Sequence, residues 1–405
     1  MNIHFIGIGG IGVSALAKYY LKKGWQVSGS DLTASAITEQ MKDMGAAVHI
    51  GNPKASLVTT QTKKIIFSPA VPKDNVERIE ARKKGIPEFS YPEALGELAK
   101  SHYTIAIAGT HGKSTTTAML GLLLTKAKID PTVIVGTQVK EFDNSNCRVG
   151  KSKYLVIEAC EHFESFLSYY PNIIVITNIE EDHLDYYKNL KNILLAFRKF
   201  ISHLPKNGYL VANKDDKNSM GIIKSKEKFA VKKYSILQKE AKKLSKILKL
   251  PGKHNVSNAL SALTVARILK IPDSVSFKAL SQFKGSWRRF EIFNLKTTNH
   301  KPYTLVSDYG HHPTEIMVTV NAAKEKWPKK KLWLVFQPHQ YHRTYMLWNN
   351  FVKVLSRLPV DKLIIADIYD VAGREDKKIK VKISSEKLVT AIMLRNSKKG
   401  LRRLL

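Results

Sequence analysis

Short apolar runs alternate with segments of helical periodicity along most of this chain. In the N-terminal part the pattern predicts strands at residues 2–6, 26–31, 47–50 and 64–68, and helices at 13–22, 35–44 and 75–84. Strands that are linked by helices favour a parallel sheet, because a crossover between parallel neighbours needs about a dozen residues or more. Pro87 and Pro92 then interrupt the pattern, so we predict that a first domain ends near residue 100.

The alternation continues through two further parts of the chain. A second group of strands is predicted at residues 103–108, 132–135, 154–158, 173–178 and 208–213, with helices beginning near residue 114 and covering 191–204. A helix that ends near residue 269 closes this group, and strands at 303–308, 332–336 and 363–367 predict another small α/β sheet. We therefore predict an α/β protein of three domains, covering residues 1–100, 101–287 and 288–405.

A candidate phosphate-binding loop lies between the first strand and the first helix of the second domain. Its residues are Gly109, Thr110, His111, Gly112, Lys113, Ser114 and Thr115. Glycines let backbone N–H groups approach a polyphosphate, and the N-terminus of the following helix adds the positive end of its dipole. Lys113 suits the β- and γ-phosphates and Ser114 suits Mg²⁺, so the loop indicates ATP with Mg²⁺. Ile107 stands where the general motif has its first glycine, and only the second half of that motif is matched.

Polar side chains also follow two strands predicted after this loop. Glu158 ends the strand at 154–158, and Asn178 and His183 come at and after the end of the strand at 173–178. The carboxyl ends of parallel strands meet at one edge of a sheet, where ligands gather. A histidine alone is more often a structural residue, but this position favours His183 and Glu158, with Ser114, as metal ligands.

A second glycine motif opens the chain. Gly7, Gly9 and Gly12 follow the first strand in the order G-x-G-x-x-G, Gly10 lies between them, and Asp31 ends the next strand. The pattern is typical of a diphosphate bound at a helix N-terminus, with the acidic residue on a ribose hydroxyl. It does not identify the rest of the ligand, so a dinucleotide-dependent oxidoreductase stays open at this point.

Composition argues against several classes of protein. Only Cys147 and Cys160 occur, which favours a reducing compartment and no disulfide framework. No apolar run approaches the roughly 18–20 residues of a membrane span, and the N-terminus passes directly into a strand without a signal peptide, so we expect a cytoplasmic protein with no membrane partner. The formal net charge is +32, but the lysines are scattered and no arginine–aromatic alternation occurs, so a nucleic-acid partner is not expected.

Taken together and in order, these motifs resemble the Mur ligases. The resemblance rests on the two glycine motifs and on Gly29-Ser30-Asp31, Glu158-Ala159, Thr177 to His183, Gly252 to Asn255, Arg288 to Glu291, Asp308 to Glu315 and Gln337-Pro338-His339. It extends from residue 4 to about residue 344. Each motif alone is weak, whereas the ordered set is specific. The first glycine motif and the block from His311 to Glu315 are most similar to the alanine-adding members.

The resemblance implies a Rossmann-like UDP-binding domain, a central ATP-binding domain built on a parallel sheet, and a C-terminal Rossmann-like domain. The implied reaction is the ATP-dependent ligation of L-alanine to the lactoyl carboxylate of UDP-N-acetylmuramate through an acyl phosphate, a step of peptidoglycan precursor synthesis. UDP-N-acetylmuramate and L-alanine are thus the expected small-molecule partners, and we expect a monomer or a homodimer.

Matching the family's motifs residue by residue implies roles for individual side chains. The implied catalytic residues are Lys113, Glu158, His183, His311 and Arg343, and the implied metal ligands are Ser114, Glu158 and His183. The implied nucleotide site comprises Gly109 to Thr115 together with Asn255, Arg288, Asp308 and Tyr309. The implied contacts of the UDP moiety are Gly9, Gly10, Gly12, Ser30 and Asp31.

Two departures from the family pattern keep alternatives open. Gln340 stands where the family usually has arginine, and residues 395–405 form a basic end where the family has a final strand and a glycine turn. The second departure implies a shortened C-terminal domain with an exposed apolar edge. The alternatives are a murein-peptide ligase that attaches a tripeptide, a nicotinamide-dependent oxidoreductase, and a catalytically impaired nucleotide-binding homologue.

Overall fold

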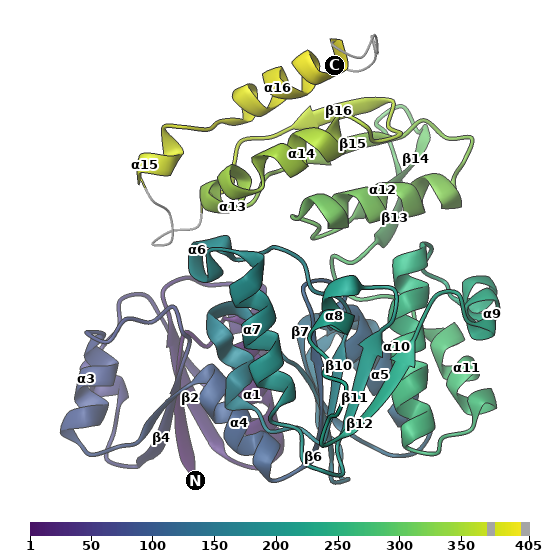
Figure 1. The fold of residues 1–405 in the computed structure, drawn as a ribbon. Helices are drawn as coiled ribbons and strands as arrows, with labels where there is room; N and C mark the ends of the chain where they lie inside the picture. Colours follow the sequence, from purple (N-terminus) through teal and green to yellow (C-terminus); the bar gives the residue numbers. More distant parts are fainter. Residues whose placement is uncertain (371–376, 398–405) are drawn as a thin grey trace.

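The computed structural model, which describes residues 1–370 and 377–397, begins with a five-stranded parallel sheet in the order β3-β2-β1-β4-β5 (Figure 1). Its strands are β1 (Asn2–Ile6), β2 (Gln26–Asp31), β3 (Ala47–Ile50), β4 (Thr62–Phe67) and β5 (Glu88–Ser90). The helices of this part are α1 (Ile11–Lys22), α2 (Ala36–Asp43), α3 (Val76–Lys83) and α4 (Tyr91–Lys100). The strand–helix alternation predicted for this part is confirmed, with the short strand β5 and the helix α4 as additional elements.

A seven-stranded sheet forms the centre of the molecule, in the order β12-β11-β10-β6-β9-β7-β8. The strands are β6 (Tyr103–Ala108), β7 (Thr132–Val139), β8 (Ser145–Arg148), β9 (Tyr154–Glu158), β10 (Ile173–Ile176), β11 (Tyr209–Asn213) and β12 (Ala230–Tyr234). All neighbours are parallel except β7 and β8. Because β9, β6 and β10 are adjacent, their carboxyl ends lie side by side, as the sequence predicts.

Both faces of the central sheet are covered by helices. On one face α5 (Lys113–Lys126) and α10 (Lys253–Ile268) pack against Ile105 and Ile107. On the other face Phe197 and Phe200 of α7 (Leu190–Ile201) join the core that contains Ile176. This arrangement explains why β10 is apolar along its whole length and β6 from Ile105 to Ala108, since a parallel strand between two helical layers is buried on both sides.

The remaining central elements are short helices, three of them before residue 214 and three after it. They are the helices α6 (Leu184–Tyr187), α8 (Lys217–Gly221), α9 (Lys239–Ile247) and α11 (Asp273–Gln282), with short 3₁₀ helices at Lys140–Phe142 and His162–Ser168. Among the described residues, no helix combines the length and apolar character that a membrane crossing requires.

The C-terminal part contains two small sheets rather than the single sheet that the sequence predicts. An antiparallel pair is formed by β13 (Glu291–Lys296) and β14 (Pro302–Ser307), and a parallel pair by β15 (Trp333–Phe336) and β16 (Lys362–Ile365). The helices are α12 (Pro313–Lys326), α13 (Tyr341–Met346), α14 (Trp348–Leu355), α15 (Lys377–Lys380) and α16 (Ser385–Ser397).

A cavity of about 520 Å³ lies between β14 and β15, which do not pair. Apolar side chains from both strands line it, and Leu305, Trp333 and Val335 are 48%, 62% and 67% exposed. The apolar edge expected in this part is therefore present. The basic terminus at residues 398–405 lies outside the described residues.

Candidate active site

The phosphate-binding loop has the backbone geometry that its glycines predict. Gly109 has a φ of +135°, and a Cβ there would lie 2.0 Å from Thr177 Oγ1. Gly112 has a φ of +81°, and its Cβ would lie 2.4 Å from Asn258 Oδ1. Other residues are strained at these dihedral angles and would collide with their neighbours, so both positions require glycine. The loop therefore runs tightly from β6 into the N-terminus of α5.

Lys113 lies at the first position of α5 and is held against a carboxylate that the sequence interpretation did not assign. Its Nζ donates to the carbonyls of Gly109 and Thr110 at 2.5 and 3.0 Å and forms an ion pair with Glu161 at 2.9 Å. Burial acts to lower the pKa of Lys113, but the Glu161 carboxylate outweighs it and raises that pKa above its usual value. The ammonium is therefore charged and lies against the carbonyls at the start of the loop.

Glu158 lies beside the loop at the end of β9, where it joins two structural elements. Ser114 Oγ donates to its Oε1 at 3.1 Å, and the amide of Gly136 donates to its Oε2 at 2.8 Å. The hydroxyl and carboxylate predicted to bind a metal are thus in direct contact. Oxygen donors of this kind are the ligands that Mg²⁺ prefers.

Asn178 and His183 follow β10, on the other side of β6. Asn178 accepts from the amide of His111 at 2.9 Å and donates to its carbonyl at 3.1 Å, so it supports the loop. The His183 ring stacks on His162 with centroids 4.2 Å apart, and its Nε2 lies 3.9 Å from Glu161 Oε1. Burial lowers the pKa of His183 to about 3. The ring is therefore neutral at pH 7, which is the state that can donate a lone pair to a metal.

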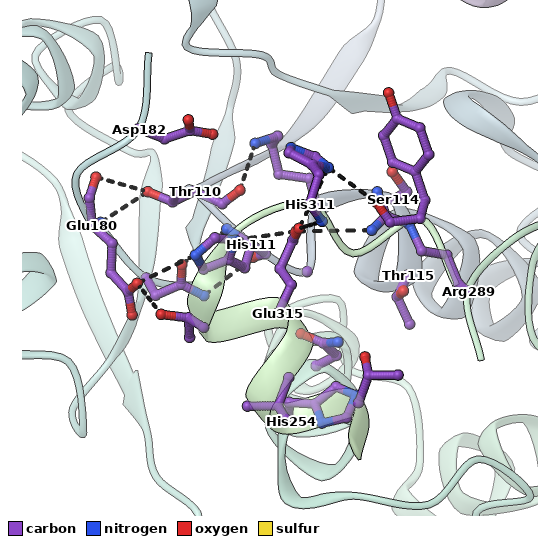
Figure 2. Close-up of a pocket in the computed structure, with 18 of the residues that line it drawn as sticks. Thr110, His111, Ser114, Thr115, Glu180, Asp182, His254, Arg289, His311 and Glu315 are labelled. Atoms are coloured by element: carbon purple, nitrogen blue, oxygen red, sulfur yellow. Dashed lines mark hydrogen bonds and ion pairs between the residues drawn. The ribbon is translucent and has the colours of Figure 1, made fainter. Parts of the chain in front are cut away.

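These residues line a cavity of about 450 Å³ between the central sheet and the C-terminal part (Figure 2). The cavity brings together the predicted residues Thr110, His111, Gly112, Lys113, Ser114, Thr115, Glu158, His183, Asn255, Asp308, Tyr309, His311 and Arg343. A second cavity of about 550 Å³ is lined by Gly10, Gly12 and Tyr91 from the first sheet's segment and by Arg288. The two cavities share Ser114, Glu158, His162, Arg289 and Tyr309.

Three predicted substrate residues lie outside the lining of both cavities. Asp31 Oδ2 accepts from the amide of Gly9 at 2.8 Å, and a Cβ on Gly9 would lie at the same distance from that oxygen. Ser30 is buried and donates to Glu77 at 2.7 Å. In this structure the contacts of these residues stabilise the first glycine loop and its surroundings. Their contact with a substrate stays a prediction.

The predicted nucleotide residues beyond the loop are held by backbone contacts. Asn255 is buried on α10 and donates to the carbonyl of Pro251 at 2.7 Å. Asp308 accepts from the amides of Phe290 and Gly310 at 2.8 and 2.7 Å, and burial raises its pKa. The Arg288 guanidinium lies 5.0 Å from the ring centroid of Tyr309. Asn255 and Asp308 line the first cavity, Arg288 lines the second, and Tyr309 lines both.

Arg343 and His311 reach the cavity from the C-terminal part. The Nε of Arg343 donates to Asp182 Oδ1 at 2.9 Å, and both side chains are buried. Burial acts against ionisation of Asp182, but the guanidinium holds its pKa well below the usual range. The His311 Nδ1 lies 3.0 Å from the carbonyl of Tyr309, and burial lowers its pKa. Arg343 thus links α13 to the loop after β10, which was not foreseen.

His111 forms a second link between the central and C-terminal parts. Its Nε2 lies 3.3 Å from Glu180 and its Nδ1 lies 3.2 Å from Glu315 on α12. Burial acts to lower the pKa of His111, but hydrogen bonds to both carboxylates raise it to about 9. The other polar groups around it are His312, with its ring centroid at 4.6 Å, Thr314 on Glu180, and Arg289, which lies 3.8 Å from Glu315.

The charge on His111 predicts a pH dependence of stability. Its folded-state pKa of about 9 exceeds the ordinary value of 6.5, so the folded chain binds this proton more tightly. The contribution is fully present below about pH 6.5 and is lost as the pH rises through about 9. We expect the thermal midpoint of the wild type to fall toward that of His111→Gln across this range, in scans without nucleotide. A constant difference between the two midpoints contradicts the assignment of charge.

Sequence reasoning assigned no role to Glu161, His162, Asp182, Glu180 or Glu315. Glu161 carries a weak signal, since it lies three residues after Glu158 in the loop that follows β9. Asp182 and Glu180 are within a motif noted above, but Asp182 pairs with Arg343, 161 residues away, and Glu180 accepts from Thr314, 134 residues away. No local pattern reveals such pairs.

Three domain families match this chain, and together they cover almost all of it. These are "Mur ligase family, catalytic domain" at residues 2–103, "Mur ligase middle domain" at 107–266 and "Mur ligase, glutamate ligase domain" at 288–400. The chain belongs to the Mur ligase family.

Curated Mur ligases include close relatives of this chain. A UDP-N-acetylmuramate–L-alanine ligase of Clostridium botulinum (strain Langeland) is 42% identical over an alignment covering 92% of this chain and 84% of the relative. The enzyme of the same name from Clostridium acetobutylicum is 43% identical, with 96% and 87% coverage. The family resemblance stated from the sequence motifs is confirmed.

Solved Mur ligase structures share the whole fold. The UDP-N-acetylmuramate–alanine ligase of Thermotoga maritima has a TM-score of 0.78 and 25% identity, covering 100% of this chain and 90% of that structure. A murein peptide ligase of Psychrobacter arcticus has a TM-score of 0.70 and 22% identity with the same coverage, and this similarity concerns the fold alone. The three-domain Mur ligase architecture is therefore the architecture of this chain.

Proposed function

We propose that this Mur ligase joins L-alanine to the lactoyl carboxylate of UDP-N-acetylmuramate, with cleavage of ATP to ADP and phosphate. The observation that carries the proposal is the pair of adjoining cavities, which share Ser114 and Glu158 next to the phosphate-binding loop. A nucleotide in one cavity and a sugar nucleotide in the other would bring their reacting ends to the shared wall. The clostridial relatives, by the reaction in their names, support the choice of substrates.

ATP is assigned to the cavity beside the loop. Its phosphates would follow the amides of Gly109 to Ser114, and Lys113 would contact the β- and γ-phosphates. Asn255, in the first turn of α10, and Asp308, directly after β14, also line this cavity and are assigned to the nucleoside. UDP-N-acetylmuramate is assigned to the second cavity, where Gly10 and Gly12 open the N-terminus of α1 toward a diphosphate.

The residues present fit a bound Mg²⁺. Ser114 and Glu158 supply two oxygen donors in mutual contact, and His183 supplies a neutral imidazole in the same cavity. When bound, the ion neutralises phosphate charge and orients the transferring group. Lys113 and the N-terminal dipole of α5 then reduce the repulsion between the substrate carboxylate and the γ-phosphate.

The proposed reaction has two steps. A carboxylate oxygen bonds to the γ-phosphorus while the bond to the β–γ bridging oxygen breaks, so ADP leaves and an acyl phosphate remains. The amine nitrogen of alanine then bonds to the acyl carbon, the carbon–oxygen bond to phosphate breaks, and the amine loses a proton. His311 faces this cavity with a lowered pKa, and a neutral imidazole is able to accept that proton.

A phosphate-release assay tests the proposal directly. The full chain is incubated with ATP, Mg²⁺ and UDP-N-acetylmuramate, and with alanine, serine, glycine or the cell-wall tripeptide as the acceptor. We expect release that depends on both the sugar nucleotide and alanine. Faster release with the tripeptide would favour the murein-peptide ligase, and ATP binding without release for any acceptor would favour an impaired homologue.

Two further properties belong to this proposal. We assign the enzyme to the cytoplasm, where ATP and the sugar nucleotide are available, and we propose a monomer or a homodimer. Gln340, which replaces the family's usual arginine, lines the ATP cavity with a backbone φ of +74° at the start of α13. Its position beside Arg343 makes it a candidate determinant of acceptor preference, which the comparison of alanine, serine and glycine also measures.

A further inference from the structure

His111, Glu180 and His312 form a cluster of side chains of the types that bind metals. The proposed reaction assigns no metal to them. One ligand atom of each residue lies within 4.8 Å of those of the other two. His111 Nε2 and His312 Nδ1 lie 3.3 and 3.8 Å from the same oxygen, Glu180 Oε2. In a tetrahedral zinc site, bond lengths of about 2.0–2.2 Å place neighbouring ligand atoms about 3.3–3.6 Å apart. Small side-chain shifts would therefore bring the three atoms to one ion.

The second ring nitrogen of each imidazole already has an oxygen partner, as is common for histidines that bind metals. The Nδ1 of His111 lies 3.2 Å from Glu315 Oε1, and the Nε2 of His312 lies 3.0 Å from the carbonyl of Glu181. Metal-ligating histidines commonly use their second nitrogen in this manner, because a carboxylate or a carbonyl fixes the tautomer and the ring orientation. Thr314 Oγ1 also donates to Glu180 Oε2 at 2.7 Å and orients that carboxylate.

We propose that His111, Glu180 and His312 bind a divalent transition-metal ion, with Zn²⁺ as the best match, and that this ion links the phosphate-binding loop to the segment preceding α12. Two imidazoles and one carboxylate suit Zn²⁺ and disfavour Mg²⁺, which prefers oxygen ligands. A water molecule completes four-coordination. The inference does not depend on the identity of the substrates.

The ion would replace two existing interactions. It takes the place of the proton that His111 shares with Glu180, and it displaces the amide of Thr314, which lies 3.2 Å from His312 Nδ1. The site is distinct from the proposed Mg²⁺ position, since Glu180 and Ser114 lie on opposite sides of His111 in Figure 2. Its three ligands come from the loop after β6, the loop after β10 and the start of α12, so metal binding would hold the C-terminal part against the central sheet.

Metal titration of the full chain, without nucleotide or Mg²⁺, tests this inference. We expect calorimetry to show one equivalent of Zn²⁺ bound, and Co²⁺ to give the intense visible absorption of a four-coordinate site. Zn²⁺ should also raise the thermal midpoint. A weak six-coordinate Co²⁺ spectrum, or no saturable binding, overturns the proposal without any variant.

Variants locate the ion. His312→Gln and Glu180→Gln should each weaken Zn²⁺ binding by about 100-fold or more, since even loss of an outer-shell partner costs roughly 10–100-fold. His49→Gln, on the first sheet, is the matched control and should bind as the wild type does. His183→Gln should also retain binding. Loss of the site in His183→Gln with retention in His312→Gln places the ion at the proposed Mg²⁺ position and overturns the assignment.

Discussion

Replacing Lys113 with alanine is expected to lower the rate of ATP-dependent phosphate release by about three orders of magnitude or more, at saturating substrates. The loss of one positioned donor to a developing charge typically costs about 10²–10³ in turnover, and Lys113 supplies a full positive charge. Two anions must approach each other before the acyl phosphate forms, and Lys113 begins the helix whose N-terminus faces them. An unchanged rate would remove the loop from the mechanism.

The structure also indicates how this experiment can be made specific. Lys113→Ala leaves the buried Glu161 carboxylate without its cation, and such an uncompensated charge costs roughly 3–5 kcal/mol of stability. A Lys113→Met/Glu161→Gln double variant removes both charges and separates catalysis from folding. Lys126→Ala, an exposed lysine at the far end of the same helix, is the matched control. The double variant should stay inactive while unfolding at nearly the wild-type denaturant concentration.

Whether a contact in the active site could be predicted from the sequence depends on how far apart its two residues lie along the chain. Ser114, Glu158 and Asn178 were predicted because each follows an apolar strand, and parallel topology alone brings such strand ends together. The Rossmann-like motif was found for the same reason, although the structure has Asp31 holding the amide of Gly9. These features depend on local pattern and on the order of strands.

What could not be predicted depends on how the C-terminal part docks. His111 meets Glu315 across 204 residues, and no periodicity in either segment records that contact. Strand β13 was missed because Glu291, Asn294 and Lys296 interrupt its apolar residues and most of it is exposed. The separation of β14 from β15 is likewise a matter of tertiary packing, since each strand alone has an ordinary strand pattern.

Replacing Arg343 with methionine is expected to lower the free energy of unfolding by about 3–5 kcal/mol, because it leaves the buried Asp182 carboxylate unpaired. Methionine retains most of the apolar volume of the arginine stem, so the effect reports the charge rather than a cavity. Denaturant unfolding checks the value, with Arg357→Met at an exposed arginine as the control. A change of less than about 1 kcal/mol, typical of surface pairs, would contradict the buried ion pair.

A double-mutant cycle distinguishes the pair from its two members. Asp182→Asn should be destabilising alone, whereas Asp182→Asn combined with Arg343→Met should recover part of the loss, since neither charge is then buried without its partner. Activity should not recover in parallel. Arg343 holds α13 against the loop that carries His183, so its absence allows the C-terminal part to separate from the ATP cavity even when the chain is folded. A double variant that regains both stability and turnover would show that the ion pair stabilises the fold without positioning the active site.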